Sequence, residues 1–145
     1  MKVKQKKLPA KDIYHENMKT ALIKDGWKIT HEQMHLKWGM KDLYVDLGAE
    51  KFMIAEKDGR KIGVEVKSFV GHSEMNDLEK AIGQYIVYHD ILQEIEPERK
   101  LYIAVPEEIF EDLFEEPIGK LLIGNKRFRL IVFDPFKEEI RKWID

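Results

Sequence analysis

An acidic residue and a lysine stand two positions apart at the end of an apolar run, as Glu65 and Lys67 in Val64-Glu65-Val66-Lys67. Side chains alternate across a β-strand, so Glu65 and Lys67 share one face while the two valines point to the other. A carboxylate and an ammonium group are costly to bury in an apolar run. Their presence here indicates that they have a chemical use.

A second carboxylate, Asp46, precedes this pair. Residues 52–55 predict a strand, and the Asp-Gly turn in residues 57–60 predicts a hairpin that joins it to the Glu65 strand. Asp46 enters the hairpin from its far end, so we expect it to lie near Glu65. Asp42 competes for this role because residues four apart share one face of a regular strand. The sequence VDLGAE, which leads directly into the hairpin, favours Asp46.

Two carboxylates beside a lysine suit the hydrolysis of a phosphodiester. Carboxylates that approach each other share a hard cation, and Mg²⁺ or Mn²⁺ with oxygen ligands and retained water suits them. Lys67 can orient a water molecule or stabilise charge that develops on a scissile phosphate. We therefore predict a metal-dependent site in which Asp46 and Glu65 hold the metal.

The elements that position these residues can be read from apolar spacing and from cap residues. Pro9 and Gly26 suit the start and the stop of a first helix. Ser73 or Asn76 can cap a long helix to about Ile95, whose broad apolar stripe predicts burial against a sheet. Further elements expected are a strand, turn and strand within 27–38, strands at 101–105, 128–133 and 138–144, and an acidic helix from Pro106. This order predicts an α/β layered domain with a mixed sheet.

The acidic residue, hairpin and Glu-x-Lys together resemble the PD-(D/E)xK nuclease superfamily. The phrases ALIKDGW, KWGMKDLYVDLGAE, VEVKSFVG, LYIAVPE and FEEPIGKLL resemble the XisH family of excision-controlling factors for the fdxN DNA element, from about Pro9 to Asp145. The resemblance implies a restriction-endonuclease-like three-layer α/β domain, a mixed central sheet flanked by helices. It also implies that Gln84 on the long helix supports the catalytic site and that Glu16 on the first helix joins the metal. The alternatives are a structural amide for Gln84 and a solvated charge for Glu16.

The sequence His31-Glu32-Gln33-Met34-His35 matches the pattern of zinc peptidases. That mechanism needs a helix, so that both histidines share a face. The apolar residues on either side alternate with period two and predict strands instead. We therefore set zinc proteolysis aside.

The charge composition limits how the protein can bind nucleic acid. The formal net charge of −2 does not indicate a general nucleic-acid binder, so any grip on DNA must be local. We predict that Lys41, Arg60 and Lys61 contact DNA, although a solvated face is the alternative for any such cluster. Further basic candidates are Lys37, Lys57, Lys126, Arg127 and Arg129.

The chain of 145 residues has the size of one domain. We expect residues 1–8 to be a flexible basic tail and residues 9–145 to be a single nuclease-like domain. The absence of cysteine excludes a disulfide scaffold and thiolate zinc sites, and no apolar run is long enough for a membrane span, so we expect a cytoplasmic protein.

Two functions follow from these observations. The first is a Mg²⁺-dependent endonuclease that acts on DNA during the controlled excision of a DNA element. The second is a non-catalytic factor that binds DNA or protein and retains the nuclease fold. The family resemblance implies a separate site-specific recombinase and an XisI-like companion protein as partners, and cleavage of two strands would favour a homodimer.

Overall fold

The computed structural model describes residues 10–32, 36–37, 44–45, 52–69, 71 and 73–145. Its elements in chain order are α1 (Ala10–Lys24), β1 (Lys28–His31), β2 (Leu36–Lys37), β3 (Tyr44–Val45), β4 (Phe52–Lys57), β5 (Arg60–Val66), α2 (Glu74–Ile95), β6 (Arg99–Pro106), α3 (Glu107–Ile109), the π-helical turn η1 (Phe110–Phe114), α4 (Pro117–Gly124), β7 (Leu130–Asp134) and β8 (Glu139–Ile144). Within these ranges, no helix is both long and apolar enough to cross a membrane. The tail expected at residues 1–8 lies outside the described residues.

Six strands of the described chain form one mixed sheet in the order β1-β4-β5-β6-β7-β8, and β2 pairs with β3 separately. The strands β5, β6 and β7 are parallel, whereas β4 and β8 pair antiparallel with their neighbours. Central parallel strands are covered on both faces, which explains their continuous apolar sequences. The prediction of a buried parallel strand at 101–105 is confirmed, although β6 extends beyond it at both ends.

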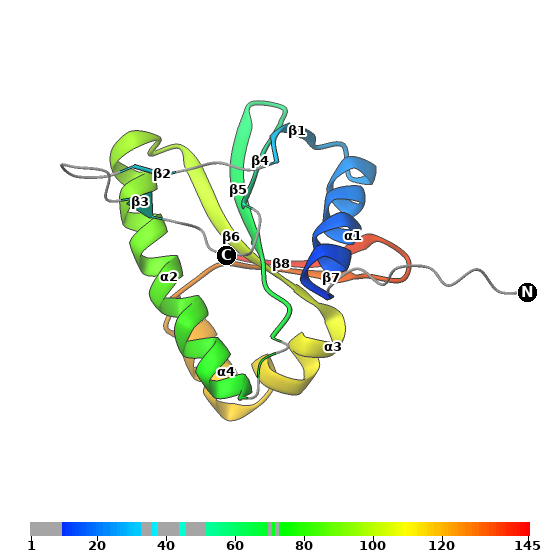
Figure 1. The fold of residues 1–145 in the computed structure, drawn as a ribbon, viewed down its shortest axis with the longest axis vertical. Helices are drawn as coiled ribbons and strands as arrows, with labels where there is room; N and C mark the ends of the chain where they lie inside the picture. The colour runs from blue at the N-terminus through cyan, green and yellow to red at the C-terminus, as the bar shows by residue number, and fades with distance from the viewer. Residues whose placement is uncertain (1–9, 33–35, 38–43, 46–51, 70, 72) are drawn as a thin grey trace, which may run out of the picture.

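Helices cover the sheet on two sides, so the predicted three-layer α/β domain is confirmed (Figure 1). One apolar core lies between the sheet and α1 and includes Val64 and Val66. The other lies between the sheet and α2, η1 and α4, and includes Phe52 and Ile103. Because side chains alternate along β5, Glu65 must face the α2 side.

The long helix begins as predicted, because Ser73 caps it: its Oγ accepts a hydrogen bond from Asn76 N at 3.2 Å. The acidic segment differs from the single helix expected. Glu115 N donates to Phe110 O at 3.1 Å, a bond across five residues that makes η1 a π-helical turn. Pro117 then starts the separate helix α4, in a position that suits proline.

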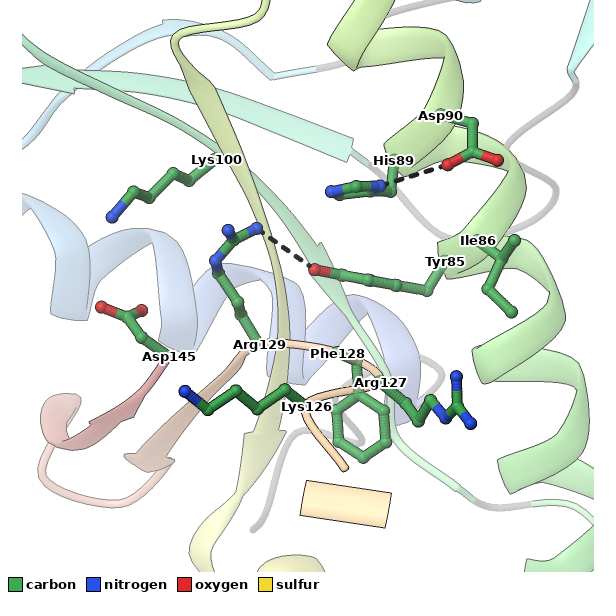
Figure 2. Close-up of a pocket in the computed structure, with 10 residues that line it drawn as sticks. All are labelled: Tyr85, Ile86, His89, Asp90, Lys100, Lys126, Arg127, Phe128, Arg129 and Asp145. Carbon is green, nitrogen blue, oxygen red and sulfur yellow. Dashed lines mark hydrogen bonds and ion pairs between the residues drawn. The ribbon is translucent and has the colours of Figure 1, made fainter. Parts of the chain in front are cut away.

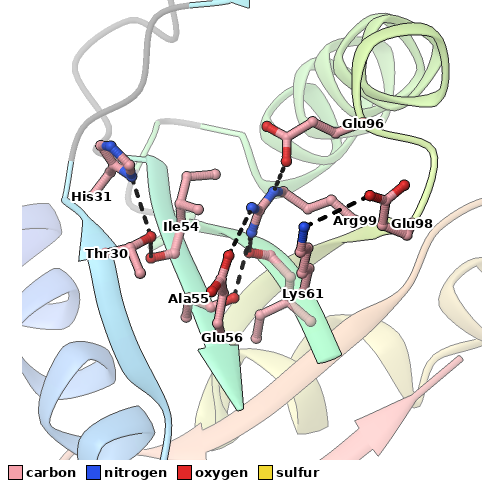
Figure 3. Close-up of polar contacts among 10 residues, drawn as sticks. Thr30, His31, Ile54, Ala55, Glu56, Lys61, Glu96, Glu98 and Arg99 are labelled. Carbon is pink, nitrogen blue, oxygen red and sulfur yellow. Dashed lines mark hydrogen bonds and ion pairs between the residues drawn. The ribbon is translucent and has the colours of Figure 1, made fainter. Parts of the chain in front are cut away.

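A buried arginine ties the sheet together at the start of β6 (Figure 3). The side chain of Arg99 is 5% exposed, and its Nη1 donates to the carbonyl of Ile62 at 3.0 Å. Its Nε lies 3.0 Å from Glu96 Oε2, and its Nη2 lies 3.5 Å from Glu56 Oε1. Arg99 therefore joins the connection after α2 to both strands of the β4–β5 hairpin, which carries Glu65.

We predict that Arg99→Met lowers the free energy of unfolding by about 2–3 kcal/mol, because hydrogen bonds to a charged donor are lost and the Ile62 carbonyl is left buried. Urea unfolding followed by circular dichroism measures this change. The matched control is Lys61→Met, which breaks only the exposed pair with Glu98 at 3.7 Å and should change stability by less than about 1 kcal/mol. Equal stabilities of the two variants would contradict the role given to Arg99.

Candidate active site beside helix α2

Glu65 lies near the carboxyl end of β5, in the middle of the sheet. It stands opposite Phe52 of β4 and Ile103 of β6, and its side chain has no exposed surface. Both neighbours are apolar, so hydration cannot stabilise a charge on Glu65. The carboxylate therefore depends on the polar groups that reach it from the α2 side of the sheet.

Lys67 and Gln84 supply such groups. Lys67 Nζ lies 3.0 Å from Glu65 Oε1 and donates to Gln84 Oε1 at 2.6 Å. The backbone of Lys67 continues the ladder, because its N donates to Ala104 O at 2.9 Å. The sheet thus fixes Glu65 and Lys67 on one face, and α2 brings Gln84 onto the ammonium group. The three residues predicted from Glu-x-Lys and the long helix come together.

Burial raises the pKa of the Glu65 carboxyl above its ordinary value, and the Lys67 ammonium opposes this shift only in part. Glu65 Oε2 has no hydrogen-bond partner among the described residues. A buried acid with a raised pKa and an unsatisfied oxygen is rare outside functional sites. Such a group can accept a proton nearer neutral pH than an exposed glutamate can, or it can bind a cation.

A small cleft of about 170 Å³ lies where the chain leaves β5. Phe69 adopts a left-handed backbone (φ 52°), which is unusual for a bulky residue. Gly71 approaches Asp77 so closely that a Cβ would lie 2.5 Å from its Oδ1, and Gly71 N donates to Asp77 Oδ2 at 2.8 Å. The cleft is lined by Lys67, Ser68, Phe69, Gly71, Asp77, Lys80 and Gln84.

Asp77 and Lys80 were missed from the sequence. They stand seven and four residues before Gln84, so the three share one face of α2. Once Gln84 is taken as a site residue, this spacing alone predicts that Asp77 and Lys80 lie on the same side of the helix. Lys80 adds a second lysine to the lining of the cleft, beside the Asp77 carboxylate.

Several predicted site residues are elsewhere. Glu16 is exposed on α1, which packs on the other face of the sheet, so the structure does not bring it to Glu65. Arg60 begins β5 and Glu65 lies near its end, so Arg60 is roughly 16 Å along the strand from the site. Its guanidinium lies over the Trp27 ring at 5.2 Å, and Lys61 Nζ lies 3.7 Å from Glu98 Oε1. Contact of these two residues with DNA stays a prediction. The predicted residues Asp46, Asp42 and Lys41 lie outside the described residues.

The described residues supply only part of a binding site for a divalent cation. No group of three histidine, aspartate or glutamate side chains within the described ranges could hold a metal ion. Mg²⁺, however, usually binds one or two carboxylates and keeps several waters. The buried Glu65 carboxylate, with one oxygen that accepts no hydrogen bond from the described residues, offers one such ligand. Asp46 remains the residue that the sequence predicts as the second.

Comparisons with known proteins agree with one another. Residues 8–141 match the family model described as XisH protein. The crystal structure of an XisH family protein from Nostoc punctiforme is 36% identical, with a TM-score of 0.83 over 92% of this chain and 100% of that chain. The crystal structure of an fdxN element excision controlling factor protein from Anabaena variabilis is 38% identical, with a TM-score of 0.82 over 92% of this chain and 99% of that one. No curated protein matches the sequence.

We predict that Glu65→Gln gains stability over the wild type as the pH rises. The pKa of Glu65 is raised from 4.5 by folding, so the folded state holds this proton more tightly and wild-type stability falls as the pH rises above about 4.5. Each unit of the pKa difference corresponds to about 1.4 kcal/mol. Glutamine cannot ionise, so the variant escapes this loss.

Melting temperatures at several pH values from about 4 to about 8 measure the difference between the two proteins. The gap should widen with pH and level off above the raised pKa. The same change at the exposed Glu79 of α2, Glu79→Gln, is the matched control. A gap between Glu65→Gln and the wild type that stays constant with pH would contradict the raised pKa.

Proposed function

This chain belongs to the XisH family, and we propose that it is a metal-dependent endonuclease of the PD-(D/E)xK type that acts on DNA. The observation that carries the proposal is the buried Glu65 carboxylate, paired with Lys67 and reached by Gln84. An acid, a lysine and an amide at the end of a central strand form a site for charge stabilisation at a phosphate.

Each residue has a distinct role in the proposed reaction. Glu65 would hold the divalent cation, together with Asp46. Lys67 donates a hydrogen bond to a phosphate oxygen, where negative charge develops during the attack. Gln84 accepts from the Lys67 ammonium group at 2.6 Å and so fixes its position. Bound Mg²⁺ or Mn²⁺ would supply Lewis-acid stabilisation of the charge on the phosphate.

The proposed biological setting is the controlled excision of a DNA element. The relative from Anabaena variabilis is described as an fdxN element excision controlling factor, and this chain is 38% identical to it. We propose that this chain also acts in a site-specific DNA rearrangement. A recombinase, an XisI-like companion and a second copy of this chain are the partners that the family and two-strand cleavage would require.

A second function is supported by the ion pair itself. Lys67 Nζ already lies within 3.0 Å of Glu65 and within 2.6 Å of Gln84, so the trio is partly compensated without a cation. Such a site could persist in a factor that binds DNA or protein and does not cleave. The description of the Anabaena relative as a controlling factor also favours this function.

Metal binding is tested by the melting temperature in Mg²⁺, in Mn²⁺ and in chelator. We predict that each metal raises the melting temperature by a few degrees, because a ligand that binds only the folded state stabilises it. Asp46→Asn and Glu65→Gln should both abolish the rise. A rise of the same size in both variants would place the metal elsewhere.

Cleavage is tested on supercoiled plasmid and on a branched oligonucleotide duplex, each with Mg²⁺, with Mn²⁺ and with chelator. We predict metal-dependent nicking that falls about 100-fold or more in Lys67→Ala, because a donor aimed at the developing charge is lost. Lys120→Gln, at an exposed position of α4 outside the cleft, is the control and should cleave like the wild type. Unchanged cleavage by a folded Lys67→Ala would refute the assignment, whereas metal binding without cleavage of either DNA would favour the binding factor.

A further inference from the structure

A second cleft lies on the other flank of α2. This helix packs over β6, with the candidate active site on its β5 side. On the β7 side, α2 and the segment that precedes β7 enclose a cleft of about 350 Å³ (Figure 2). This basic cleft is lined by Tyr85, Ile86, His89, Asp90, Lys100, Lys126, Arg127, Phe128, Arg129 and Asp145.

The basic cleft gathers positive charge on a chain whose formal net charge is −2. Its lining holds four lysine and arginine side chains against two carboxylates among the described residues. None of these four cations forms an ion pair with a carboxylate of the described chain. Elsewhere many cations are paired, as in the contacts of Lys61 with Glu98 and of Arg141 with Asp134.

Contacts within the chain position two of these four cations, Arg129 and Lys126. Arg129 Nη1 donates to Tyr85 Oη at 3.5 Å, and Tyr85 Oη in turn donates to Leu101 O at 3.1 Å (Figure 2). Lys126 has a left-handed backbone (φ 53°), and its N donates to Ile123 O at 2.9 Å. A lysine costs more in this conformation than glycine or asparagine would. Arg129 is thus held by Tyr85, and the backbone of Lys126 is fixed where it enters the basic cleft.

We propose that the basic cleft binds a phosphate group of a DNA strand. Phosphate contacts come mainly from lysine and arginine and position a protein on DNA without reading its sequence. The volume of about 350 Å³ is near the lower end for ligand pockets, which suits one phosphate with part of its sugar. Arg129, held by Tyr85, presents a planar set of donors that matches phosphate oxygens.

The position of the basic cleft relative to the candidate active site explains why DNA is the ligand. Gln84 lines the active-site cleft and Tyr85 lines the basic cleft, and consecutive helical residues are turned by about 100°. A DNA strand that crosses α2 can therefore touch both clefts, one phosphate in each. This inference rests on the proposed function only in naming DNA; the cations bind a phosphate whether or not Glu65 supports cleavage.

The test is DNA binding by Lys126→Asn/Arg129→Gln, measured by fluorescence anisotropy of a labelled duplex in chelator, so that no cleavage occurs. Asparagine tolerates the left-handed backbone at position 126 and removes the charge. We expect the dissociation constant to rise at least about tenfold, and the slope of log affinity against log salt to fall by about two, one for each phosphate-binding cation lost. The control Lys28→Gln/Lys120→Gln removes the same charge from two exposed positions outside both clefts.

Equal affinities and salt slopes in the wild type, the control and Lys126→Asn/Arg129→Gln would overturn the proposal, as would a wild type that binds no DNA. If the double variant melts below the wild type, Lys126→Asn alone carries the test, with a slope change of about one. Melting temperatures with inorganic phosphate distinguish a DNA phosphate from a small phosphate compound as the anion that the basic cleft binds. Inorganic phosphate could raise the melting temperature of the wild type but not of the double variant, while the two proteins bind DNA with equal affinity. That result would assign the basic cleft to a small phosphate compound and overturn the DNA proposal.

The two proposals fail separately. Loss of DNA affinity in Lys126→Asn/Arg129→Gln, together with no cleavage of either DNA by the wild type, would keep the basic cleft and remove the endonuclease. If Lys67→Ala loses cleavage and the double variant binds DNA like the wild type, the endonuclease proposal stands and the basic-cleft proposal fails.

Discussion

The structure depends on one costly interaction, the burial of the Glu65 carboxylate in the centre of the sheet. Neither neighbouring strand offers it a polar side chain, because Phe52 and Ile103 stand opposite it. Lys67 on the same face supplies the opposite charge at 3.0 Å, yet burial still raises the pKa of Glu65. A pair of apolar residues at these two positions would pack without this cost. This cost in stability supports the functional role that we propose for the pair.

Helix α2 links this pair to the rest of the molecule. It covers the sheet with its apolar face, and its flanks present polar groups to two different clefts. Gln84 reaches Lys67 on one flank, while Tyr85 holds Arg129 on the other. The connection from α2 to β6 is fixed by Arg99, which also binds the β4–β5 hairpin. A shift of α2 along the sheet would thus disturb both clefts at once.

Much of this arrangement follows from local rules. Strand alternation places Glu65 and Lys67 on one face, the Ser73 cap fixes the start of α2, and apolar runs identify the parallel strands. What the sequence could not supply is which face of the sheet each helix covers. The family resemblance implies that Glu16 joins the metal, whereas α1 packs on the opposite face of the sheet.

The central claim is that Glu65 is a metal ligand in a phosphodiesterase site. The most direct measurement is anomalous diffraction from a crystal soaked in Mn²⁺. We expect an anomalous peak roughly 2.2 Å from a Glu65 carboxylate oxygen, a distance typical of a small divalent cation with oxygen ligands. A crystal in which Mn²⁺ occupies only other positions, while Glu65 contacts Lys67 alone, would contradict it.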